Sequence, residues 1–190
     1  MKFTLFTFVS ILIMASCGGK DATPKPIAYP RIDRENIVWK DYEDTRFSIE
    51  YPNDAKIVPQ QSEDNKEVWF NIVYPSYRAT IHCTYLPITK SSLPSVLEDN
   101  YKLAYSHASK AEGIKQMQYS NEDNNTYGIL YDIGGLVAVP VQFFVTDSTT
   151  HFFRGSLYYN NQVNNIDSIE PITESLRNDI KRMMSTLQWK

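Results

Sequence analysis

The sequence predicts an α+β domain in which an antiparallel β-sheet lies between two helices. Apolar and polar residues alternate over several short segments, a pattern typical of strands with one buried face. Two longer segments instead repeat their apolar residues every three or four positions, as one face of a helix does: 97–111 and 169–187. The order is strands, helix, further strands and a last helix, with no internal repeat.

The expected sheet begins before the first helix. In its last strand there, Cys83 shares a face with Ile81 and Tyr85, whereas His82 points to the other face. We therefore expect Cys83 to be a buried core residue. The expected strands are 37–42 and 47–52, paired across a turn at 43–45, followed by 68–74 and 79–85.

The first helical stripe places small residues toward the sheet. Ser95 and Glu98 have the spacing of a capping box, and Pro94 stands where the start of a helix tolerates proline. Gly113 is the expected end of this helix. The residues of the stripe are Leu97, Tyr101, Ala104, Ala108 and Ala111.

A meander of strands is expected after this helix. Gly134 and Gly135 predict a two-residue hairpin turn, and Pro140 indicates a bulge or an edge. The final helix would be capped by Asp167 or Ser168, with Pro171 in its first turn. The expected strands are 115–120, 127–133, 141–145 and 153–159.

Both faces of the last two strands are apolar, because Phe144, Phe152 and Tyr158 lie opposite the apolar set of 141–145. Such strands need a covering layer on each side. If one cover is incomplete, these three side chains and Arg154 would form an exposed surface for a protein partner. The alternative is that helices cover both faces and Arg154 pairs with a neighbouring acid.

The first residues have the layout of a bacterial lipoprotein signal. Lys2 is followed by an apolar run too short to span a bilayer, and Met14-Ala15-Ser16-Cys17 resembles a lipobox. The resemblance implies removal of residues 1–16 and lipidation of Cys17. Residues 17–30, rich in Pro and Gly, would form a tether, and residues 31–190 a single α+β domain.

Composition excludes some partners. The net charge is −3 and basic residues are not clustered, which argues against nucleic acid and against electrostatic adsorption to anionic lipid. Once Cys17 is lipidated, Cys83 has no disulfide partner.

We find no chemistry that predicts catalysis. His82, His107 and His151 are expected in a strand, a helix and a turn, without metal-ligand spacing, so neither a metal nor a cofactor is expected. Motifs for nucleophiles, redox pairs and phosphate loops are absent. Asp147 and Ser148 lie close to His151 in sequence, but a hairpin turn explains such residues better than a triad does. Asp132 and Glu122 form no recognisable carboxylate pair.

Several phrases spread over nearly the whole chain are distinctive as a set. They are the lipobox at Cys17, TPKPIAYPRID (23–33), FSIEYP (47–52), WFNIVYPSYRATIHCTY (69–85), LAYSHASKAE (103–112), YGILYDIGG (127–135), VQFFVTDSTTHFFRGSLYYN (141–160) and LQWK (187–190). Together they resemble one family, the gliding-motility lipoproteins GldD of Bacteroidetes-type bacteria. FSIEYP and the order of elements also resemble the Mog1/PsbP-like sandwich, a fold used mostly for binding.

The family resemblance implies a membrane-anchored component of surface gliding and of the linked type IX secretion system. Its partners would be other lipoproteins of that machinery, and no catalytic residue carries over. Two alternatives stay open: a small-ligand-binding envelope lipoprotein and an envelope hydrolase. We expect attachment to an envelope membrane on its periplasmic side. Signals that export lipoproteins to the cell surface are typically rich in acidic residues after the cysteine, and here Asp21 is the single acid close after Cys17.

Overall fold

The computed structural model describes residues 32, 34, 36–62, 65–106, 110–160 and 166–190. The signal, Cys17, the tether and His107 lie outside these residues. Within them the chain forms an antiparallel sheet in the order β3-β4-β5-β9-β8-β7-β6. Its strands are β3 (Lys56–Gln60), β4 (Val68–Tyr74), β5 (Ala79–Pro87), β6 (Gly113–Asn121), β7 (Thr126–Gly134), β8 (Val141–Thr146) and β9 (His151–Tyr159).

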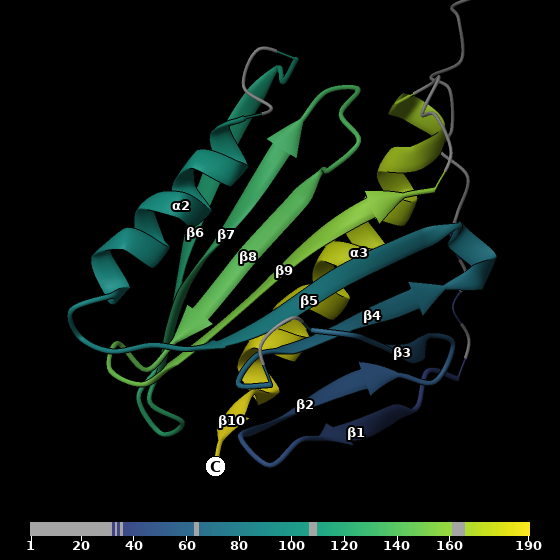
Figure 1. The fold of residues 1–190 in the computed structure, drawn as a ribbon. Coiled ribbons are helices and arrows are strands. Elements are labelled where there is room, and N and C mark those ends of the chain that lie inside the picture. Colours follow the sequence, from purple (N-terminus) through teal and green to yellow (C-terminus); the bar gives the residue numbers. More distant parts are fainter. Residues whose placement is uncertain (1–31, 33, 35, 63–64, 107–109, 161–165) are drawn as a thin grey trace, which may run out of the picture.

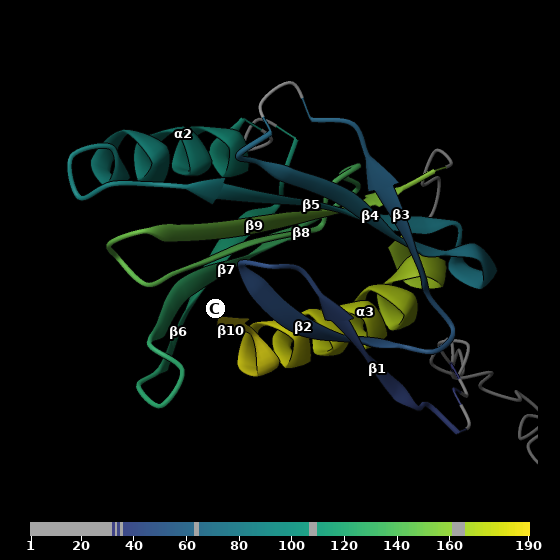
Figure 2. The same ribbon diagram turned by 60° about the horizontal axis from the view of Figure 1, so that its bottom comes forward.

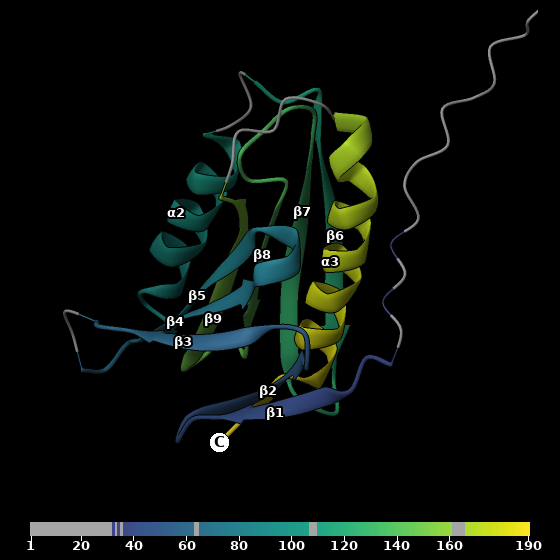
Figure 3. The same cartoon turned by 90° about the vertical axis from the view of Figure 1, so that its right-hand side faces the viewer.

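The two helices cover opposite faces of this sheet. Helix α2 (Leu93–Tyr105) lies toward its β6–β7 side, and α3 (Ile166–Thr186) crosses the other face (Figures 1 and 2). The expected arrangement of an antiparallel sheet between two helices is therefore confirmed. Seen from the side in Figure 3, the strands stand between the helices.

A second, small sheet shares the α3 side of the molecule (Figure 2). It has the order β1-β2-β10, formed by β1 (Trp39–Glu43), β2 (Phe47–Pro52) and β10 (Gln188–Trp189). The expected pairing of the first two strands is confirmed, with Tyr42 opposite Ile49. Their inclusion in one sheet with the others was wrong, because β2 takes the C-terminal β10 as its second neighbour.

The α3 face carries the larger core. The ring of Phe47 lies 5.3 Å from Phe153 and 5.4 Å from Tyr85, so the small sheet is packed onto the large one through aromatic contacts. Leu176 and Ile180 of α3 are fully buried there. Cys83 is 2% exposed in this core, as expected, and burial raises the pKa of its thiol.

Helix α2 is shorter than predicted. It ends at Tyr105, and Gly113 opens strand β6 instead of closing the helix. Ser95 lies inside the helix, so the expected capping box is wrong: Ser92 is the N-cap, and a turn from Thr89 fixes the start through the bond from the Ser92 N–H to the Thr89 hydroxyl. Pro94 does stand at the tolerated position.

Other local expectations also failed. Gly134 closes β7 and Gly135 takes a positive φ of 97°, but the connection continues to Val141, so the turn is longer than two residues. Helix α3 begins at Ile166, which places Asp167 and Ser168 inside it and Pro171 beyond its first turn. The short strands β3 and β10 were not predicted, because neither has a clear apolar alternation.

Candidate functional site

The residues of β5 and β9 that point away from the large core are mostly polar. The strand register sets His82 beside Ser156, and Thr84 beside Arg154. On the next strand, Gln142 of β8 also lies beside Ser156. A polar floor therefore runs across three strands on the α2 side of the sheet.

This floor and helix α2 enclose a cavity of about 330 Å³. Such a volume is at the lower end of the range for small-ligand sites. Polar side chains from four separate elements converge on it, and Leu103 and Tyr158 contribute apolar surface. Its lining consists of His82, Thr84, Asn100, Leu103, Ser106, Gln142, Arg154, Ser156 and Tyr158.

Arg154 is the strongest charge of this cavity. Its side chain is half-buried, and no carboxylate in the described chain pairs with it. Burial lowers the pKa of the guanidinium, and the more distant charges of Glu67 and Asp99 offset this only in part. The guanidinium nevertheless stays protonated, because arginine does not lose its proton in proteins.

Two nearly buried amides line the same cavity. Asn100 of α2 is 3% exposed, and its amide nitrogen has no hydrogen-bond partner in the described chain. Asn100 is close enough to affect the pKa of the Tyr131 hydroxyl, but no hydrogen bond of ordinary geometry joins the two side chains. Gln142 of β8 is 5% exposed and lines the cavity from the floor. Buried amides without partners are rare in folded proteins.

His82 borders the site but carries no charge there at neutral pH. Partial burial lowers the pKa of its imidazole, which accords with a neutral ring. Its Nδ1 lies 2.8 Å from the Asn71 side-chain oxygen, and its ring meets the edge of Tyr158 at 5.1 Å. Arg154 is thus the one formal positive charge among the lining residues of the cavity.

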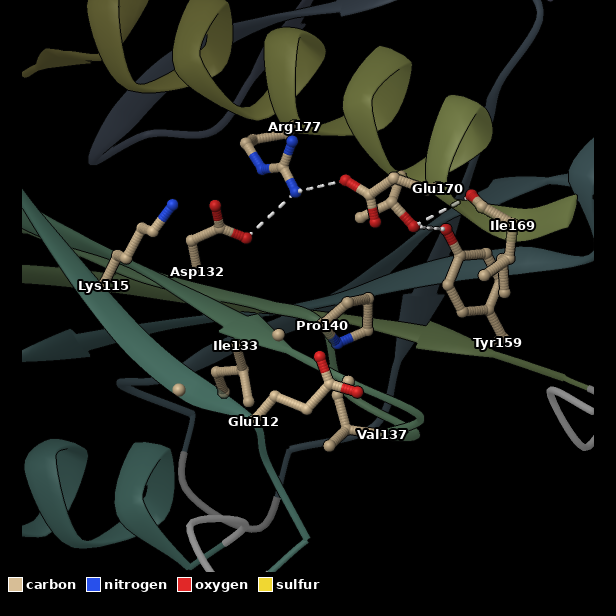
Figure 4. Close-up of a pocket in the computed structure, with 14 residues that line it drawn as sticks. Glu112, Lys115, Asp132, Ile133, Val137, Pro140, Tyr159, Ile169, Glu170 and Arg177 are labelled. Atoms are coloured by element: carbon tan, nitrogen blue, oxygen red, sulfur yellow. Dashed lines mark hydrogen bonds and ion pairs between the residues drawn. The ribbon is translucent and has the colours of Figure 1, made fainter. Parts of the chain in front are cut away.

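A second cavity of about 310 Å³ lies on the other side of the sheet, beneath α3 (Figure 4). Arg177 occupies its wall, with a bond of 2.9 Å to Asp132 of β7 and further ion pairs to Glu170 and Glu174. Burial alone would lower the pKa of Arg177, but these carboxylates raise it. The charge of Arg177 is therefore paired within the fold, although its Nε has no hydrogen-bond partner in the described chain, and the cluster fastens α3 to the sheet.

The structure divides the four residues of the expected partner surface. Phe144 and Phe152 stack at 5.3 Å and are 6% and 0% exposed, because α2 covers them. The expectation that these two rings are exposed was wrong. Tyr158 is 37% exposed, and Arg154 lies beside it in the cavity. The alternative, that helices cover both faces, thus holds for these two rings, whereas its second part, pairing of Arg154 with an acid, does not hold in the described residues.

Sequence reasoning missed Asn100, Gln142 and Ser156. The signal that could have found the last two is the polar face of the final strands, where Arg154 and Ser156 alternate with buried residues. Asn100 offered no such signal, because one polar residue within a helical stripe is common.

Asp147 builds a turn, as the hairpin interpretation predicted. Its carboxylate accepts hydrogen bonds from the backbone N–H groups of Thr149, Thr150 and His151 and from both threonine hydroxyls. His151 is directed elsewhere: its Nδ1 is 2.8 Å from the Tyr85 hydroxyl, and its ring stacks on Trp189. Asp132 faces Arg177, and Glu122 lies in the β6–β7 turn.

In the described residues, no three His, Cys, Asp or Glu side chains gather closely enough to hold a metal ion. Within the same ranges, neither α2 nor α3 combines the length and apolar character needed to span a bilayer.

Fold and sequence comparisons assign the class and then the family. The architecture is Mog1/PsbP-like: the solution structure of the cyanobacterial PsbP protein CyanoP from Synechocystis sp. PCC 6803 is similar, with a TM-score of 0.51 at 12% identity, over 92% of this chain and 98% of that one. Residues 19–189 match the family model of the gliding motility lipoprotein GldD. The chain belongs to this family, and the class is that of a gliding-motility lipoprotein. A comparison with curated protein sequences gave no match.

Proposed function

We propose that this chain is a lipid-anchored binding protein that assembles or stabilises the gliding machinery and the type IX secretion system linked to it. The observation that carries the proposal is the family match over residues 19–189. Its partners would be other lipoproteins of that machinery, met on the periplasmic side of an envelope membrane. No catalytic step forms part of this role.

The exposed apolar residues of the α2 side support a contact surface. Leu103 is 48% exposed and Tyr158 37% exposed, and both border the same cavity. Tyr101 of α2, 47% exposed, stacks on Tyr105 of the same helix. Aromatic residues of this kind are enriched where proteins bind one another. We assign the partner surface to the rim of this cavity, formed by Leu103 and Tyr158, in place of the buried Phe144 and Phe152.

A deletion strain complemented with variants tests the role. We expect loss of colony spreading and of type IX cargo in the medium without the gene, and recovery of both with the wild-type chain. A deletion strain that spreads and secretes normally would refute the proposal. For the surface, a photo-crosslinking residue at Tyr158 should capture a machinery lipoprotein, whereas the same residue at exposed Val58 on β3 serves as the control.

The anchor is tested by Cys17→Ser. Acyl chains each add about 0.8 kcal/mol of membrane affinity per buried methylene, and stable attachment needs more than one chain. Cys17→Ser should therefore leave the membrane fraction while keeping the circular dichroism spectrum and melting temperature of the wild-type domain. Continued fractionation with membranes would contradict lipidation at this position.

The second candidate function, binding of a small ligand, is favoured by the cavity beneath α2. Its volume of about 330 Å³ reaches the size at which small-molecule sites begin. The two roles are compatible, because the cavity lies inside the rim that we assign to a partner.

A further inference from the structure

Arg154 has no carboxylate partner in the described chain, unlike four other arginines. Arg34, Arg46, Arg177 and Arg182 each form an ion pair of 2.7–2.9 Å with a carboxylate. Even Arg182, with a side chain 46% exposed, has such a partner. Half-buried Arg154 has none in the described chain, although burial makes an unpaired charge more costly. Its charge therefore contributes no ion pair to the fold of the described chain.

The amides of Asn100 and Gln142 are a second indication that this cavity binds a ligand. They come from α2 and β8, two elements far apart in sequence, and both line the same cavity as Arg154. Each is more than nine-tenths buried, and the Asn100 amide nitrogen has no hydrogen-bond partner in the described chain. A bound acceptor would give this unpaired Asn100 donor a hydrogen bond.

We propose that the cavity beneath α2 binds a carboxylate-bearing ligand, whose carboxylate pairs with the Arg154 guanidinium and accepts hydrogen bonds from Asn100, Gln142 and Ser156. An arginine fork matches the two oxygens of a carboxylate. Tyr158 and Leu103 at the rim contact the apolar part of the ligand. The carboxylate belongs either to a free small molecule or to an acidic side chain of a protein. The proposal deepens the second candidate function, ligand binding in this cavity, and rests on it.

The charge of the cavity selects a monoanion over a phosphate dianion. Arg154 is the single cation of the lining, and His82 beside it is neutral at neutral pH. The negative charges of Glu67 and Asp99 also reach Arg154. A dianion would keep one uncompensated charge close to these acids, which disfavours phosphate.

Titration of the full-length protein in detergent, followed by the backbone amide signals of Gln142 and Ser156 in NMR spectra, tests the site. The probes are benzoate with its neutral analogue benzamide, acetyl-Gly-Glu-Gly-amide with its Gln counterpart, and inorganic phosphate. We expect saturable shifts with a carboxylate probe and binding at least about tenfold weaker with its neutral analogue. Binding of benzoate alone identifies a free small molecule as the source, whereas tighter binding of the Glu peptide identifies a protein side chain.

Arg154→Gln should weaken carboxylate binding about 10- to 100-fold, since the charge-assisted bond is lost. Lys181→Gln is the matched control: it removes one positive charge from exposed α3 on the other face, and binding should not change. Ser156→Asp supplies a carboxylate beside Arg154 from the chain itself and should block the probes in a folded protein. Absence of binding by both carboxylates, phosphate binding as tight as theirs, or full affinity in Arg154→Gln or Ser156→Asp would overturn the proposal.

Discussion

The two faces of the large sheet each contain a substantially buried arginine, in opposite surroundings. Under α3, the Arg177 side chain is 8% exposed and ion-paired to Asp132, Glu170 and Glu174. Under α2, Arg154 lines a cavity and pairs with no described carboxylate. The aromatic packing differs as well, because the α3 face contains a network of rings and the α2 face a smaller cluster. The α3 face is thus tied together by ion pairs and rings, whereas the α2 face leaves polar side chains around a cavity.

Neighbouring residues of β9 test this difference most strongly. Phe153 points to the α3 face, where rings of Phe47, Phe70 and Phe143 lie within 6.1 Å, while Phe152 stacks on Phe144 on the α2 face. We expect Phe153→Ala to reduce the free energy of unfolding by about 4–5 kcal/mol and Phe152→Ala by about 3 kcal/mol. Urea unfolding of both variants measures the two losses. Equal losses would mean that the two cores contribute equally.

The two arginines give the next largest contrast. Arg177→Gln leaves three carboxylates without their common partner and should cost about 2 kcal/mol of stability, less than a fully buried pair because Glu170 and Glu174 remain hydrated. Arg154→Gln removes an unpaired charge and should change stability by less than about 0.5 kcal/mol, or increase it. Thermal unfolding at matched pH compares them. A large loss in Arg154→Gln would show that this arginine supports the fold after all.

A smaller effect concerns the turn that keeps β8 and β9 in register, on which both faces depend. Burial alone would raise the pKa of Asp147, but hydrogen bonds from Thr149, Thr150 and His151 outweigh it and hold the pKa well below its usual range. Because the folded pKa is depressed, the stabilisation is complete above the unfolded pKa and is lost as pH falls toward the folded value.

Asp147→Asn should therefore be less stable than the wild type by about 1–2 kcal/mol at pH 7. The difference should begin to shrink below about pH 4, where the unfolded carboxylate takes up its proton. Denaturant unfolding across this pH range measures it. A difference that stays constant from pH 7 into strong acid would show that the charge of Asp147 contributes nothing.

Alternation of apolar residues was sufficient to predict β2, β4 and β5, because each of these buries one face in a core. The same rule failed for β3 and β10. Their burial is slight and their pairing depends on neighbours that fold beside them from elsewhere in the chain. The end of α2 was also misjudged: the predicted stripe ran to Ala111, whereas the helix ends at Tyr105 and β6 begins at Gly113.

The sequence by itself determined the α+β class, the burial of Cys83, the turn at Asp147 and the family, because each depends on local periodicity, local hydrogen bonding or recurrent phrases. Only the tertiary structure decided that Phe144 and Phe152 are covered, that β2 joins a separate sheet with β10, and that Asn100 comes to lie with Gln142 and Arg154. Those outcomes depend on how α2 and the C-terminus dock against strands distant in sequence. No pattern within a single segment encodes such docking.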